Sequence, residues 1–247
     1  MRRIRFIALG AAGLLLAGCG SAPGAPELRV FAAASLTASF TELTEAFAAE
    51  HPGVTIAPIS FDGSATLATQ ILEGAPVDIF ASANEPTMAK VEAELLAPAE
   101  IFAINTLQLA VEPGNPKGIT GLADLAREEL LVVLCAPEVP CGDASHTLLD
   151  LDGVTVTPVS EEQNVSAVLS KVAAGEADAG LVYVTDVAGS GGIVAGVDIA
   201  GAERAANRYL IGVLQRTQNA ELAQAFVDYV LSPAGQAILG SHGFRAP

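Results

Sequence analysis

A short apolar run that ends in a serine could form one wall of an anion-binding site. Residues 30–34 are apolar and favour a strand, and after Ser35 the apolar residues recur at helical spacing. A serine at a helix N-terminus offers a hydroxyl donor beside unpaired backbone N–H groups and the positive end of the helix dipole. Such groups bind anions without a cationic side chain. The alternative is that Ser35 only caps its helix, as serine commonly does.

Three further junctions combine a strand or loop with a helix start that carries small or polar residues. They are Gly63-Ser64, Pro140-Cys141-Gly142 and Asn164-Val165. Each alone says little, because every α/β protein has such junctions. If the fold brings all four to one cleft, they form a nest of N–H and O–H donors.

The residue types that carry metal or hydrolytic chemistry are present but lack the necessary spacing. The three histidines are scattered, and Cys135 and Cys141 have no matching second pair, which argues against a zinc site. The chain has no phosphate-cradling glycine motif with a lysine. Gly63-Ser64 does not continue as a nucleophile elbow, and a triad of Ser35 and His146 with an aspartate would be an assumption. We therefore expect no enzyme and no catalytic residues.

Composition narrows the class of partner. The chain has 247 residues, 51% of them hydrophobic, so it can bury a sizeable core in one large or two modest domains. Its formal net charge of −16 argues against nucleic acid or an anionic membrane surface as partner. If the protein binds an anion, local dipoles must overcome the field of the whole molecule.

The first residues predict export. Three arginines precede an apolar run at 6–17, which is too short for an ordinary membrane span and typical of a secretory signal. The run ends in Leu-Ala-Gly-Cys at 16–19, which resembles the bacterial lipoprotein cleavage box. We expect a signal peptide at 1–18, a lipid on Cys19 and a flexible tether at 19–26. The protein would then be anchored at the outer face of the cell membrane or in a periplasm; the alternative is a plain signal peptide with an incidental cysteine.

Strand and helix patterns alternate in two series on either side of a Pro- and Gly-rich segment at 112–121. After the first strand, the expected strands are 54–60, 76–81, 130–134, 154–158, 180–184 and 209–214. The expected helices are one that follows Ser35, then 65–73, 85–95, 121–129, 143–151, 164–174, 220–231 and a short one from 232. This pattern favours an α/β protein of two lobes with a ligand in the cleft between them. We expect 27–107 and 209–247 in the first lobe and 108–208 in the second.

The chain resembles the periplasmic molybdate-binding component of ABC importers over nearly all of its mature length. The matching stretches are 30–36 (Val-Phe-Ala-Ala-Ala-Ser-Leu), 63–70, 74–83, 140–142, 164–165 and 180–183. The resemblance implies the type II periplasmic solute-binding fold, in which two α/β lobes are joined by a two-strand hinge. It also implies a monomeric receptor that binds molybdate, or tungstate, and delivers it to the membrane permease of an ABC importer. The alternatives are a receptor for sulfate or another tetrahedral oxyanion, an extracytoplasmic hydrolase, and a purely structural lipoprotein.

The same resemblance implies which atoms hold the oxyanion. Ser35 and Ser64 would give hydroxyl and backbone donors, Cys141 and Val165 their backbone N–H groups, and Tyr183 its phenolic O–H. Without the resemblance, Val165 and Tyr183 would be interpreted as core residues. The transported ligand would be the only bound group, with no further metal or cofactor.

Two positions depart from the family pattern. Asp62 places a carboxylate just before Gly63-Ser64, where it would repel a dianion, and we expect it to point away to solvent. Cys141 accompanies Cys135, and in an exported protein we expect a disulfide between them that stiffens the loop presenting the Cys141 N–H. The alternative is a pair of buried free thiols.

Overall fold

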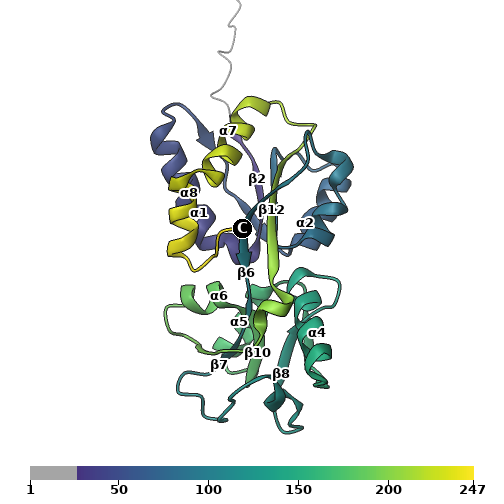
Figure 1. The fold of residues 1–247 in the computed structure, drawn as a ribbon. Helices are drawn as coiled ribbons and strands as arrows, with labels where there is room; N and C mark the ends of the chain where they lie inside the picture. The colour runs from purple at the N-terminus through teal and green to yellow at the C-terminus, as the bar shows by residue number, and fades with distance from the viewer. Residues whose placement is uncertain (1–26) are drawn as a thin grey trace, which may run out of the picture.

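The computed structural model describes residues 27–247 (Figure 1). The predicted signal peptide, the lipidation site Cys19 and the tether lie outside these residues. Within the described part of the chain, no helix combines the length and the apolar character needed to cross a membrane.

The first lobe is built on a five-stranded sheet in the order β4-β2-β5-β12-β6. Its strands are β2 (Val30–Ala33), β4 (Ser60–Asp62), β5 (Ile79–Ser82), β6 (Glu100–Asn105) and β12 (Asn207–Val213). β2 pairs in parallel with β4 and β5, whereas β12 runs antiparallel to β5 and β6. β1 (Glu27–Leu28) and β3 (Thr55–Ile56) form a separate, short parallel pair.

Helices cover both faces of this sheet. They are α1 (Thr37–Glu50), α2 (Ser64–Leu72), α3 (Glu85–Ala89), α7 (Ala220–Leu231) and α8 (Pro233–Ser241). α1, α7 and α8 share one hydrophobic core with the sheet, and α2 and α3 share another with Phe80 (Figure 1). Phe40, Leu43 and Phe47 of α1 are completely buried, as their helical spacing predicted.

The second lobe is built on a second five-stranded sheet, in the order β11-β7-β10-β8-β9. Its strands are β7 (Leu107–Val111), β8 (Val132–Cys135), β9 (Ser160–Glu162), β10 (Ala179–Tyr183) and β11 (Ala195–Val197). Its α-helices are α4 (Pro140–Asp152), α5 (Val165–Ala173) and α6 (Val184–Gly189). β8 pairs in parallel with β9 and β10, so the N-termini of α4 and α5 follow strands that point the same way.

The chain crosses between the lobes twice. The first crossing is at Thr106, between β6 and β7, and the second follows β11 and enters β12 at Asn207 (Figure 1). Asn105 and Asn207 are register partners in the antiparallel pair of β6 and β12, so the crossings lie side by side. The Asn105 side chain donates to Thr185 Oγ1 at 2.8 Å, which ties the end of β6 to the second lobe.

The structure corrects four predicted elements. The helix expected at 85–95 is divided into α3 and a 3-10 helix, η2 (Glu92–Glu94). Residues 154–158 form no strand; β9 begins two residues after Pro158, a residue without an N–H to donate to a sheet. The strand expected at 54–60 is divided into β3 and β4, and Pro58 lies in the gap. The α-helix expected at 121–129 is a single stretch of 3-10 helix at Leu122–Ala126. The sequence also gave no sign of α6 and β11.

Candidate functional site

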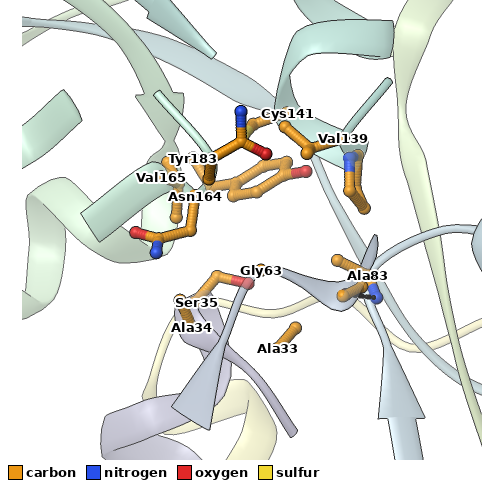
Figure 2. A pocket seen from close by; sticks show the side chains of 13 residues that line it. Ala33, Ala34, Ser35, Gly63, Ala83, Val139, Cys141, Asn164, Val165 and Tyr183 are labelled. Atoms are coloured by element: carbon orange, nitrogen blue, oxygen red, sulfur yellow. Dashed lines mark hydrogen bonds between the residues drawn. The ribbon is translucent and has the colours of Figure 1, made fainter. Parts of the chain in front are cut away.

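One pocket between the lobes collects all five residues that were expected to hold the ligand. Its lining combines backbone and side chains of both lobes, most of them at helix starts or in loops (Figure 2). The lining residues are Ala33, Ala34, Ser35, Gly63, Ser64, Ala83, Val139, Pro140, Cys141, Gln163, Asn164, Val165 and Tyr183. The centre of a water molecule has about 20 Å³ to move in there, so the pocket suits a ligand of a few heavy atoms.

Ser35 lies in a short 3-10 helix, η1 (Ala34–Leu36), between β2 and α1. Neither η1 nor α1 has a side-chain cap, so Ser35 is not the plain helix cap that was its alternative interpretation. Its hydroxyl lies 2.8 Å from Tyr209 Oη. If Tyr209 donates this bond, the proton of the Ser35 hydroxyl stays available for a ligand.

Ser64 is the first residue of α2 and is almost completely buried. Its Oγ accepts a hydrogen bond of 3.0 Å from the backbone N–H of Ala83, which leaves the hydroxyl proton free to be donated. No side chain caps α2 at its N-terminus. The backbone N–H groups of its first turn are therefore also available to an anion.

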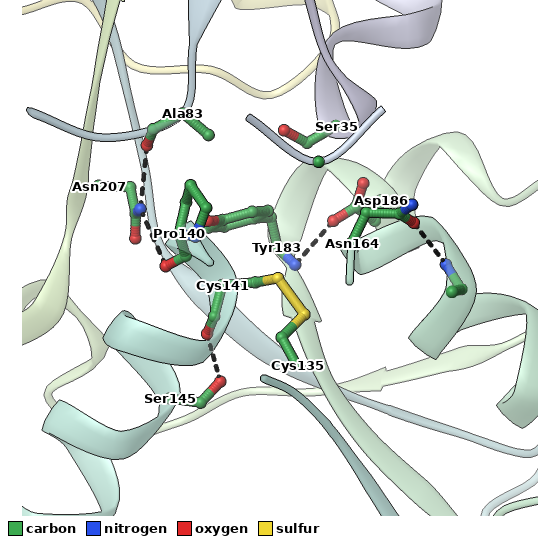
Figure 3. Close-up of a disulfide and its surroundings, with 12 residues drawn as sticks. Ser35, Ala83, Cys135, Pro140, Cys141, Ser145, Asn164, Tyr183, Asp186 and Asn207 are labelled. Atoms are coloured by element: carbon green, nitrogen blue, oxygen red, sulfur yellow. Dashed lines mark hydrogen bonds between the residues drawn. A yellow bond between two sulfur atoms is a disulfide. The ribbon is translucent and has the colours of Figure 1, made fainter. Parts of the chain in front are cut away.

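Cys141 lies in the first turn of α4, directly after Pro140. A disulfide joins it to Cys135 at the end of β8, as expected (Figure 3). A Cβ atom on Gly142 would lie 1.8 Å from the carbonyl oxygen of Ala136, so the loop between the cysteines is packed against the helix start. α4 also lacks a side-chain cap, which leaves its first N–H groups without a side-chain acceptor.

Val165 and Tyr183 reach the pocket from two other elements of the second lobe. Val165 is the first residue of α5, and the side chain of Asn164 caps that helix by accepting from Ala167 N at 3.0 Å. Tyr183 ends β10 and is 1% exposed. Within residues 27–247, its buried phenolic oxygen has no hydrogen-bond partner. A buried hydroxyl without a partner is costly, so this group points to a ligand.

The pocket is electrically neutral at the level of side chains. None of its described lining residues is Lys, Arg, His, Asp or Glu. Burial raises the pKa of Tyr183 well above its usual value, so the phenol remains protonated and can donate. Behind it, Asp186 accepts from the backbone N–H of Tyr183 at 2.8 Å, and burial raises the pKa of this carboxyl to about 7. The donors are therefore hydroxyl and backbone groups.

Asp62 does not line the pocket, as predicted, but the expectation that it faces solvent is wrong. Its Oδ1 accepts from the backbone N–H of Gly63 at 2.7 Å and from Asn164 Nδ2 at 2.9 Å. The second partner belongs to the other lobe, which could not be inferred from the sequence near Asp62.

Two supporting residues were also missed. Tyr209 of β12 contacts Ser35, and Asn207 donates to the carbonyl oxygens of Ala83 at 2.9 Å and Pro140 at 3.4 Å (Figure 3). Asn207 lies two residues before the strand that was expected at 209–214, and no sequence pattern pointed to it.

These features place the chain in a class. A family model of bacterial extracellular solute-binding proteins matches residues 28–245, and the chain belongs to that family. The two α/β lobes, the paired crossings and the pocket between them confirm the predicted type II fold.

Individual proteins resemble this chain in sequence or in structure. The chain is 46% identical to the molybdate-binding protein ModA of Mycobacterium tuberculosis over 231 residues, 92% of this chain and 88% of that protein. The periplasmic molybdate-binding protein of Azotobacter vinelandii has a similar structure, with a TM-score of 0.76, 23% identity and coverage of 89% and 99%. The sulfate-binding protein SubI of Mycobacterium tuberculosis has a TM-score of 0.74 at 18% identity, with coverage of 90% and 87%. These structural likenesses show the fold alone.

Proposed function

We propose that this protein is an extracytoplasmic receptor that binds molybdate, and tungstate, between its lobes and delivers it to an ABC importer. The observation that carries the proposal is a small pocket with hydroxyl and backbone donors from both lobes and, among residues 27–247, no charged side chain in its lining. The 46% identity to a molybdate-binding protein supports the same ligand.

In this proposal each predicted residue has one role. Ser35 and Ser64 donate their hydroxyl protons and backbone N–H groups from the first lobe. Cys141 and Val165 donate backbone N–H groups at the starts of α4 and α5, and Tyr183 donates its phenolic proton. A hydrogen bond to a charged acceptor contributes about 1.5–3 kcal/mol net, so a set of such donors can offset the desolvation of a dianion.

The absence of carboxylates among the described lining residues also bears on selectivity. Molybdate and tungstate are dianions without a proton at neutral pH, so all of their oxygens accept. A protonated phosphate would turn one of its own protons toward another donor, and the lining offers no carboxylate to receive that proton. Sulfate is a bare dianion too, so its rejection would depend on the size of the cavity.

The placement in the cell follows from the family and from the leader. The family is extracellular. We propose that Cys19 carries the lipid that holds this receptor at the outer face of the membrane, close to the permease that it serves, and that it works as a monomer. The charged start, the apolar core and the Leu-Ala-Gly-Cys sequence support the anchor.

Calorimetry with molybdate, tungstate, sulfate and phosphate on the chain from Ala25 onward tests the proposal. We expect micromolar or tighter binding of the first two anions, which corresponds to a binding free energy of about −8 kcal/mol or below. Sulfate and phosphate should bind far more weakly. Sulfate binding as tight as molybdate binding would reject the assignment in favour of a general oxyanion receptor.

A further inference from the structure

One carboxylate oxygen connects the two lobes beside the pocket. Asp62 ends β4 in the first lobe, and Asn164 precedes α5 in the second, 102 residues later in the chain. Asp62 Oδ1 accepts from Asn164 Nδ2 at 2.9 Å and, at the same time, from Gly63 N at 2.7 Å. Asp62 does not line the pocket, so it acts on the residues that do.

Both donors belong to residues that begin a ligand-facing helix. Gly63 is the N-cap residue of α2, directly before Ser64. Asn164 is the N-cap residue of α5, directly before Val165, and its Oδ1 accepts from Ala167 N at 3.0 Å. Because the cap fixes the amide plane of Asn164, its Nδ2 group is held toward Asp62. The carboxylate therefore joins the starts of two helices from opposite lobes.

Backbone contact at the same place shows how closely the lobes approach. A Cβ atom on Gly63 would lie 2.2 Å from the carbonyl oxygen of Gln163, so this approach requires glycine. In Figure 2, Asn164 and Ala83 lie on opposite sides of the pocket. Asn207 bridges the lobes on the Ala83 side, by bonding the carbonyl oxygens of Ala83 and Pro140. The Asp62 contact thus closes the side away from the crossing strands.

We propose that Asp62 is a positioning residue for anion binding: its hydrogen bond to Asn164 holds the lobes closed and aligns the starts of α2 and α5 on the ligand. The ligand named here rests on the function proposed above. A carboxylate beside a dianion site costs affinity through repulsion, but two N–H donors on one oxygen offset part of that charge. The bond forms only between closed lobes, so it slows ligand release more than it speeds capture.

Variants of the full-length protein, purified in detergent, test this role by molybdate titration and by release kinetics. Asp62→Ala should weaken binding about tenfold, mostly through faster release. Asp62→Asn keeps an acceptor oxygen for both donors and should restore binding to within about threefold of the original. Asn164→Asp keeps the helix cap, but it sets two carboxylates against each other and places one of them in the lining of the pocket, so it should weaken binding more than Asp62→Ala.

Asp124→Ala is the matched control. Asp124 also accepts two hydrogen bonds with one oxygen, from the N–H and the hydroxyl of Thr120, but both partners lie in the second lobe. It should change the melting temperature slightly and the affinity not at all. Equal affinity of Asp62→Ala and the unchanged protein would overturn the proposal, and so would an Asp62→Asn variant as weak as Asp62→Ala.

A second measurement separates this inference from the identity of the ligand. Spin labels on the outer surfaces of the two lobes report the distance between them in ligand-free protein. Asp62→Ala and Asn164→Asp should shift the distribution to longer distances, whereas Asp124→Ala should leave it unchanged. If the original protein binds no molybdate, the proposed function fails and the distances still decide the role of Asp62. Distances that none of these variants changes would overturn it.

Discussion

The unpartnered phenol of Tyr183 gives the sharpest test of the site, because ligand binding and folding should respond to its removal in opposite directions. Tyr183→Phe deletes one oxygen and keeps the ring, which packs edge-on against Tyr209 with ring centres 5.9 Å apart. The hydroxyl is buried and finds no partner among the protein atoms of residues 27–247. Burial of a hydroxyl without a partner costs about 1–3 kcal/mol, so the free energy of unfolding of the variant should be higher by about 1 kcal/mol.

Binding should change the other way. A hydrogen bond from a neutral donor to a charged acceptor contributes about 1.5–3 kcal/mol, and each 1.4 kcal/mol is a factor of ten. Tyr183→Phe should therefore raise the Kd for molybdate by about 10- to 150-fold. Calorimetry gives the Kd, and urea denaturation of the ligand-free protein gives the free energy of unfolding.

Tyr229→Phe is the control for these measurements. Tyr229 lies in α7, packs against Phe47 with ring centres 5.6 Å apart, and does not line the pocket. Its variant should leave the Kd unchanged. The reasoning is refuted if Tyr183→Phe binds molybdate as tightly as the original protein, or if it loses stability together with affinity.

Three further predictions concern other parts of the site. Ser35→Ala and Ser64→Ala should each raise the Kd by about tenfold or more without unfolding the protein; unchanged calorimetric titrations would remove both serines from the site. Reduction of the disulfide between Cys135 and Cys141 should lower the free energy of unfolding by about 2 kcal/mol and weaken binding, because the loop is short and presents the Cys141 N–H; equal denaturation curves would contradict this. Burial raises the pKa of Asp186 from 3.8 to about 7, so the folded protein holds a proton that the unfolded chain releases. Its stabilising contribution should be complete below about pH 4 and be lost as the pH rises to 7. Asp186→Asn should remove that part of the decline, and parallel stability curves for the two proteins would count against it.

The sequence was informative where local patterns decide the structure. The apolar spacing after Ser35 predicted the buried face of α1. The resemblance to a family predicted five ligand-binding residues, and the structure brings all five to one pocket. Their roles as ligands stay predictions, as do the lobe boundaries at 27–107, 108–208 and 209–247.

Contacts between distant residues could not be predicted in this way. Ser35 bonds Tyr209, which lies 174 positions later, and Asp62 bonds a side chain of the other lobe. The expectation for Asp62 considered only its repulsion of a dianion. No local sequence pattern reveals that two N–H groups donate to its carboxylate. The predicted strand at 154–158 was wrong for a related reason. Its valines pack against the core of the second lobe without joining the sheet.

The division of the proposed donor groups between two lobes has a consequence for release of the ligand. Ser35 and Ser64 stand on one half, while Cys141, Val165 and Tyr183 stand on the other, and neither half surrounds the guest by itself. No countercharge in the lining needs to be exchanged for a proton or a salt ion. If the protein binds an oxyanion as proposed, displacement of one lobe against the other would expose that anion to water without a proton or salt ion having to take its place.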